Sequence, residues 1–203
     1  EPPGARNYVD LLALIAPPED AEEFTVTLTA IPGTTLHGVV MDSNGKRVSG
    51  VEAANLIEGQ MSFQPIQGNE FSIPDFAADR PRKFLLYRPE SREGALVRLT
   101  GREDPEEPLE VKLEPCGSIR GKLVDADGKP VAGALLVLHL NRYIGEPKWS
   151  TRSNDSGEFI VTGLIPDQIY NGAIGSQTPR GYVVDEVSTK PGEEVDLGAV
   201  LVE

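Results

Sequence analysis

Few residues in this sequence have the chemistry of catalysis or metal binding. Its histidines are His37 and His139, and its single cysteine is Cys116. A catalytic thiol needs a nearby base and a zinc site needs three or four ligands, but these three residues lie far apart in the sequence. The motifs G-x-S-x-G and H-E-x-x-H and phosphate-binding glycine loops are absent. We therefore expect a protein that is not an enzyme, without cofactor, metal ion or intrachain disulfide, in which Cys116 has a packing role.

Acidic residues form two other candidate sites, and both have a simpler interpretation. The segment 125–128 places two aspartates at alternate positions, as a calcium loop does, but the chain then continues into Lys129 and Pro130. The sequence Asp-Ala-Asp-Gly is also typical of a tight turn, which is the interpretation we prefer. The acidic runs at 19–23 and 103–107 are expected to be solvated loops.

The strongest candidate for molecular recognition is the segment 141–149. It contains the only tryptophan, Trp149, together with Arg142 and Tyr143, and these residue types are enriched at interface hot spots. Such side chains would also suit stacking on a sugar ring, so carbohydrate binding is one hypothesis. The alternative is that Trp149 closes the edge of the fold and has a packing role.

The composition excludes several classes of partner and fold. The 203 residues include 19 Lys and Arg against 32 Asp and Glu, and the net charge of −13 opposes binding to nucleic acid or to an anionic membrane. No apolar run approaches the ~20 residues that span a bilayer, so we expect no membrane insertion. The 21 glycines and 17 prolines exclude a long helical bundle, because these residues are strongly unfavourable inside helices.

An internal repeat organises the sequence. The segment 33–50 aligns with 116–133, so that Gly38 corresponds to Gly121, and the C-terminal segment 192–203 resembles the end of each unit. We therefore expect a piece of a longer array. Its expected parts are the terminal strands of an incomplete unit at 1–32 and two full units at 33–116 and 117–203.

Each full unit has the pattern of short β-strands. In the segment 118–124, Ile119 and Leu123 alternate with polar residues, which is the two-residue period of a strand. Turn signals such as the Asn-Asp-Ser-Gly sequence at 154–157 separate successive strands. This pattern predicts an all-β fold made of sandwiches.

The predicted strand at 134–140 is apolar on both faces. Comparison with 51–56 in the first unit assigns Ala134, Leu136 and Leu138 to the core. It assigns Leu135, Val137 and His139 to the outer face. An apolar outer face favours a surface covered by a loop or by another part of the array over one that binds an external ligand. The candidate interaction patch consists of these three residues together with Arg142, Tyr143 and Trp149.

Two segments of the second unit resemble the carboxypeptidase regulatory-like domain. They are 121–137, with the sequence GKLVDADGKPVAGALLV, and 154–164, with the sequence NDSGEFIVTGL, followed by Tyr170. The first unit keeps the first motif and less of the second. The resemblance implies tandem seven-stranded Greek-key β-sandwiches of the transthyretin-like, Ig-like type, found as non-catalytic modules of extracytoplasmic proteins.

Together these observations predict a structural spacer or protein-interaction region of a larger extracytoplasmic protein, in the periplasm, at the cell surface or secreted. Its expected partners are neighbouring domains of a longer chain and a protein or carbohydrate ligand. Two alternative functions stay open: a carbohydrate-binding module that uses the loop 141–149, and an accessory domain of a peptidase or receptor.

Overall fold

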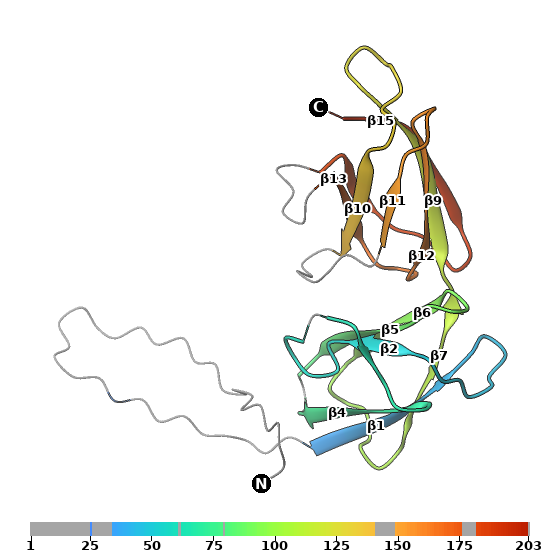
Figure 1. Cartoon of the computed structure of the whole chain (residues 1–203). Coiled ribbons are helices and arrows are strands. Elements are labelled where there is room, and N and C mark those ends of the chain that lie inside the picture. Colours follow the sequence, from blue (N-terminus) through green and yellow to red (C-terminus); the bar gives the residue numbers. More distant parts are fainter. Residues whose placement is uncertain are drawn as a thin grey trace, which may run out of the picture.

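The computed structural model describes Thr25 and residues 34–60, 62–78, 80–140, 149–175 and 182–202. In these residues the regular structure consists of β-strands, so the protein is all-β, as predicted (Figure 1). The strands fall into two groups that form separate sheets, at residues 34–115 and 117–201. Apart from Thr25, the incomplete unit predicted at 1–32 lies outside the described residues.

The first unit is the group of strands from β1 to β8. These are β1 (Thr34–Met41), β2 (Glu52–Ala54), β3 (Gln64–Pro65), β4 (Glu70–Phe76), β5 (Arg82–Arg88), β6 (Glu93–Leu99), β7 (Leu109–Lys112) and β8 (Glu114–Pro115). They form a three-stranded sheet with the order β4-β1-β7 and a five-stranded sheet with the order β3-β2-β5-β6-β8.

The second unit is the group of strands from β9 to β15. These are β9 (Gly117–Val124), β10 (Leu135–Leu140), β11 (Trp149–Arg152), β12 (Glu158–Leu164), β13 (Tyr170–Ile174), β14 (Val184–Val187) and β15 (Glu194–Leu201). They form a three-stranded sheet with the order β12-β9-β15 and a four-stranded sheet with the order β11-β10-β13-β14. Figure 1 shows this unit on the side of the first unit where β2, β5 and β6 lie.

The two units repeat the same strand pairing. In the first unit, β1 lies between the antiparallel strand β4 and the parallel strand β7. In the second unit, β9 lies in the same way between the antiparallel strand β12 and the parallel strand β15. The predicted equivalence between the C-terminal segment and the last strand of the first unit is therefore confirmed.

Equivalent turns follow β1 and β9. The Oδ1 atom of Asp125 accepts hydrogen bonds from the amides of Asp127 and Lys129, at 3.0 and 2.9 Å, and Gly128 has a φ of +77°. Asp42 accepts the same two bonds in the first unit, and the bond from the Lys46 amide is the main cause of its lowered pKa. The turn interpretation of the segment 125–128 is therefore confirmed, because the carboxylate of its first aspartate, Asp125, accepts hydrogen bonds from backbone amides of the turn.

Each unit has a hydrophobic core between its two sheets. In β9 the predicted alternation is confirmed, because Ile119 and Leu123 are fully buried whereas Arg120 is exposed. The core of the first unit includes the buried residues Leu36, Val40, Val51, Ala53, Phe71, Ile73, Phe84, Leu86, Leu99 and Val111. The core of the second unit includes the buried residues Ile119, Leu123, Leu136, Leu138, Trp149, Phe159, Val161, Tyr170, Val184 and Val200.

Candidate functional site

The central strand of the five-stranded sheet, β5, is buried on both faces. In β5 the consecutive residues Phe84, Leu85 and Leu86 are all fully buried, although successive residues of a strand point to opposite faces. Phe84 and Leu86 belong to the core of the first unit, whereas Leu85 and Ala54 pack in the cluster that contains the core of the second unit. The second unit therefore covers the outer face of this sheet.

We call this contact between the units the joint. Its members from the first unit are Ala54, Phe63, Leu85, Tyr87, Gly94 and Leu96, and its members from the second unit are Trp149, Gly163, Ile165 and Tyr170. Buried residues of both units belong to one hydrophobic cluster. The joint is therefore continuous with the hydrophobic core of the second unit.

Aromatic rings meet edge to face at the joint. The centroid of the Trp149 ring lies 5.9 Å from those of Phe63 and Tyr87 in the first unit, and 5.2 Å from that of Tyr170 in its own unit. The interplanar angles of 81°, 65° and 78° place the positive edge of one ring on the negative face of another. Pairs of this kind contribute about 0.5–1.5 kcal/mol each beyond the burial of their area.

Hydrogen bonds fix the two aromatic residues that the second unit contributes. Nε1 of Trp149 donates to the carbonyl oxygen of Gly163 at 2.6 Å, so the only polar atom of this buried side chain is satisfied. The hydroxyl oxygen of Tyr170 accepts a hydrogen bond from the amide of Ile165 at 2.8 Å. Burial raises the pKa of Tyr170 well above its usual range, so the phenol is neutral. The rings are therefore held in one orientation against the first unit.

Two glycines allow the units to approach closely. A Cβ atom at Gly163 would lie 2.6 Å from the hydroxyl oxygen of Tyr87, and the φ of this glycine is +80°. A Cβ atom at Gly94 would lie 2.9 Å from Cγ1 of Ile165. Since real Cβ contacts are not this short, a larger residue at either position would force the neighbouring side chain, Tyr87 or Ile165, to shift.

The chain passes from one unit to the other without a linker. Cys116 is the single residue between β8, which belongs to the first unit, and β9, which belongs to the second. The amide of Cys116 donates to the carbonyl oxygen of Arg92 at 2.8 Å, and the amide of Gly192 donates to that of Pro115 at 2.9 Å. Backbone hydrogen bonds therefore hold Pro115 and Cys116, the two residues at the connection, in place.

The thiol of Cys116 is partly buried and packs against the cluster that contains the joint. Burial, with a smaller effect from Glu93, raises the pKa of Cys116 to about 12. Because the thiolate is the reactive form, we expect the native protein at pH 8 to react with 5,5′-dithiobis(2-nitrobenzoate) at least ~100-fold more slowly than the protein in guanidinium chloride. The absorbance of the released thiolate measures both rates, and Cys116→Ala is the control for other reactions. Rapid labelling of the native protein would show that the joint is open.

Trp149 is not available to a ligand. It is the first residue of β11, its side chain is 4 % exposed, and it packs in the joint. Stacking on a sugar needs an accessible ring, and the burial of Trp149 therefore gives that hypothesis no support. Its packing role is the interpretation that agrees with the structure. Arg142 and Tyr143 lie outside the described residues.

The outer face of β10 carries the other three residues of the predicted patch. Leu136 and Leu138 are fully buried in the core, as predicted. On the opposite face Val137 is 4 % exposed although it belongs to neither core cluster, and Leu135 and His139 are partly buried. Burial lowers the pKa of His139. Whether these residues form an interaction patch with Arg142 and Tyr143 stays a prediction.

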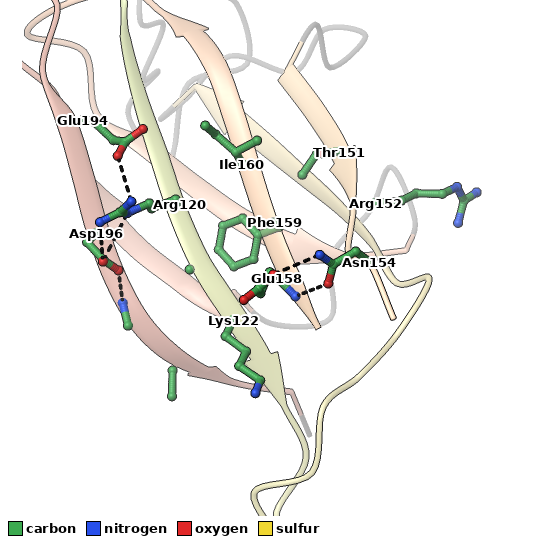
Figure 2. Close-up of a pocket in the computed structure, with 13 residues that line it drawn as sticks. Arg120, Lys122, Thr151, Arg152, Asn154, Glu158, Phe159, Ile160, Glu194 and Asp196 are labelled. Atoms are coloured by element: carbon green, nitrogen blue, oxygen red, sulfur yellow. Dashed lines mark hydrogen bonds and ion pairs between the residues drawn. The ribbon is translucent and has the colours of Figure 1, made fainter. Parts of the chain in front are cut away.

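A groove lies over the three-stranded sheet of the second unit (Figure 2). It has a volume of about 810 Å³, and half-exposed Ile160 of β12 lies in its lining. Figure 2 shows Arg120 between Glu194 and Asp196, with ion-pair distances of 3.2 and 3.1 Å. A backbone hydrogen bond from Gly198 is the main cause of the lowered pKa of Asp196. The guanidinium group of Arg120 and the carboxylates of Glu194 and Asp196 are therefore paired with one another.

The first unit has a groove at the equivalent position, with a volume of about 650 Å³. It is lined by His37 and Ser72, which correspond to Arg120 and Ile160 in the second unit. His37 is exposed, as predicted, and its Nδ1 lies 3.1 Å from Oγ of Ser72. Because the groove recurs with different side chains, it follows from the shape of the sheet and indicates no particular ligand.

Within the part of the chain that the structure describes, no group of three or more His, Cys, Asp or Glu side chains is placed to hold a metal ion. In the same part of the chain, no helix has the length and apolar character that crossing a membrane requires.

Comparison with known proteins gives distant structural similarities. No protein family and no curated protein matches the sequence. Among solved structures, similar chains include the Bacillus anthracis TIE protein (14 % identity, TM-score 0.33), over 82 % of this chain and 34 % of that one. Others are the shaft pilin SpaA from Lactobacillus rhamnosus GG (13 %, TM-score 0.32, 83 % and 97 % covered) and a streptococcal ancillary pilin (14 %, TM-score 0.33, 84 % and 62 % covered). This chain therefore spans about a third of the TIE protein, and similarity at this level does not transfer a function.

Proposed function

We propose that this chain is a non-catalytic tandem β-sandwich module that acts as a stiff structural spacer in a larger extracytoplasmic protein. In this proposal both units are Greek-key sandwiches; among the described residues the second has the expected seven strands, whereas the first has eight because the short strand β8 is added to its larger sheet. The module separates and orients neighbouring domains or presents them to a protein partner. The location rests on the resemblance to carboxypeptidase regulatory-like domains.

The joint is the observation that supports this function. A spacer has to transmit the orientation of one domain to the next, whereas domains joined by small polar contacts move relative to each other by default. Here Trp149 packs against Phe63 and Tyr87 across the joint, and Cys116 is the one residue between the sheets. Bending the joint would expose apolar surface and break the two backbone hydrogen bonds beside Cys116.

The alternative of a carbohydrate-binding module has less support than the spacer. The aromatic residue on which that alternative mainly depends, Trp149, is buried in the joint. Among the described residues that line the groove over β9, β12 and β15, the one aromatic residue is Phe159, which is 5 % exposed and offers no accessible ring.

The distance between the two units tests the proposed stiffness. Nitroxide labels at exposed positions 46 and 129 (Lys46→Cys and Lys129→Cys, with Cys116→Ala) place one probe in each unit, in the equivalent turns. We expect double electron–electron resonance to give one narrow distance distribution, which broadens when Tyr87→Ala is added. Exchange of exposed Tyr182 for Ala is the matched control and should leave the distribution narrow. A broad distribution without these exchanges would mean independent units and would overturn the proposal.

A further inference from the structure

Two asparagines in this sequence are followed by glycine, Asn44 and Asn171. An Asn-Gly pair can lose ammonia spontaneously, because the glycine amide nitrogen attacks Cγ of the asparagine with little steric hindrance. The reaction needs an accessible side chain and a backbone that can leave its native conformation for a moment. The structure gives the two pairs very different environments.

Asn44 lies at the tip of the turn between β1 and the chain that follows it. Asn44 and Gly45 are both exposed, and Gly45 has a φ of +82° with open space around the position of its missing Cβ. The amide of Asn44 donates to Oδ1 of Asp42, but its side-chain amide has no hydrogen bond to the described residues. One bond restrains the attacking nitrogen, from the Gly45 amide to the carbonyl oxygen of Asp42 at 3.0 Å.

Asn171 lies in β13, between β10 and β14 in the four-stranded sheet. It is 7 % exposed, and its Oδ1 atom accepts a hydrogen bond from the amide of Glu186 at 2.9 Å. Gly172, which follows it, lies opposite Leu138 in the antiparallel ladder with β10. The attack at this position requires separation of a central strand, whereas at Asn44 it requires opening of one exposed turn.

We propose that Asn44 is a site of spontaneous deamidation with water as the only co-reactant. The Gly45 nitrogen bonds to Cγ of Asn44 and loses its proton, the Cγ–Nδ2 bond breaks, and ammonia leaves. Water then opens the resulting succinimide ring at one of its two carbonyl carbons. The products have aspartate or isoaspartate at position 44, so the chain gains one negative charge and no group is oxidised or reduced.

The equivalent turn of the second unit indicates which of the two products the turn at Asn44 can accommodate. Asp127 occupies the position equivalent to Asn44, and its carboxylate lies 3.3 Å from Nζ of Lys129. Aspartate therefore fits this turn geometry, with Lys46 at the position equivalent to Lys129. Isoaspartate adds a methylene group to the backbone between positions 44 and 45. It would displace the bonds that the amides of Gly45 and Lys46 donate to Asp42.

Peptide mapping by mass spectrometry after incubation of the native chain at pH 8.5 and 37 °C tests the proposal. We expect deamidation at Asn44 to be about tenfold or more faster than at Asn171, because opening the central strand requires partial unfolding. In guanidinium chloride the two rates should become similar, and an isoaspartate-specific methyltransferase should label the native product. Asn44→Gln should remove the native reaction and leave the reaction of the unfolded chain at Asn171.

Two results would overturn the proposal. One is a native rate at Asn44 no higher than that at Asn171. The other is an Asn44 that stays intact in the native chain while it reacts in the unfolded chain, since the turn would then protect it. Neither result bears on the stiffness of the joint, so this proposal and the spacer function are tested separately.

Discussion

Trp149→Ala is expected to lower the free energy of unfolding of the whole chain by about 3–5 kcal/mol, the usual range for removing a large buried aromatic side chain. The exchange removes contacts with Phe63 and Tyr87 across the joint and with Tyr170 in the second unit. It also leaves the carbonyl oxygen of Gly163 without its 2.6 Å hydrogen bond. The loss is expected to affect both units, because the indole ring packs against both.

Guanidinium unfolding followed by far-UV circular dichroism measures this effect, since the variant lacks the only tryptophan. Tyr182→Ala is the matched control, because this aromatic side chain is 52 % exposed and should cost less than ~1 kcal/mol. Trp149→Phe should lie between the two, since it keeps an aromatic ring and loses the hydrogen bond. A loss below ~1 kcal/mol for Trp149→Ala would contradict the described packing of the joint.

Gly163→Ala is expected to lower the free energy of unfolding by about 2–4 kcal/mol. The added methyl group would meet the Tyr87 hydroxyl at 2.6 Å, and overpacking of this kind typically costs ~1–3 kcal/mol. The φ of +80° adds ~1 kcal/mol, because a side chain is unfavourable in the left-handed region. Thermal and guanidinium unfolding measure the sum of these two effects.

Two further variants separate the contributions. Gly128 has a similar φ, +77°, with nothing within 4 Å of its missing Cβ, so Gly128→Ala should show the backbone cost alone. Adding Tyr87→Phe to Gly163→Ala removes the atom at 2.6 Å and leaves the ring carbon at 3.6 Å, so it should restore the part of the stability lost to overpacking. Equal losses for Gly163→Ala and Gly128→Ala would mean that the units are not in contact at Tyr87.

Much of each unit could be predicted from local signals. The glycines at positive φ, such as Gly45, Gly128 and Gly157, mark turns directly, because other residues rarely adopt that conformation. The alternation at 118–124 predicts the face that each residue occupies, since a strand has a period of two. These features depend on neighbours in the sequence, and for that reason one sequence is enough to show them.

The joint could not be predicted in the same way. Trp149 contacts Phe63 and Tyr87, which lie far from it in the sequence, and no local pattern records such a pairing. One signal was available in the uninterrupted run Phe84-Leu85-Leu86, because a short continuous apolar run is typical of a strand buried on both faces. That run predicts a covered sheet, but it does not identify the indole ring that covers it.

The parallel pairing of β9 with β15 has a mechanical consequence. A tension applied to the chain at Gly117 and Leu201 pulls these two strands along their length in opposite directions. The hydrogen bonds between them are then loaded in shear and have to break together, whereas a hairpin pulled at its open end unzips one bond after another. The second unit therefore resists extension along the direction in which a chain of such units would be stretched.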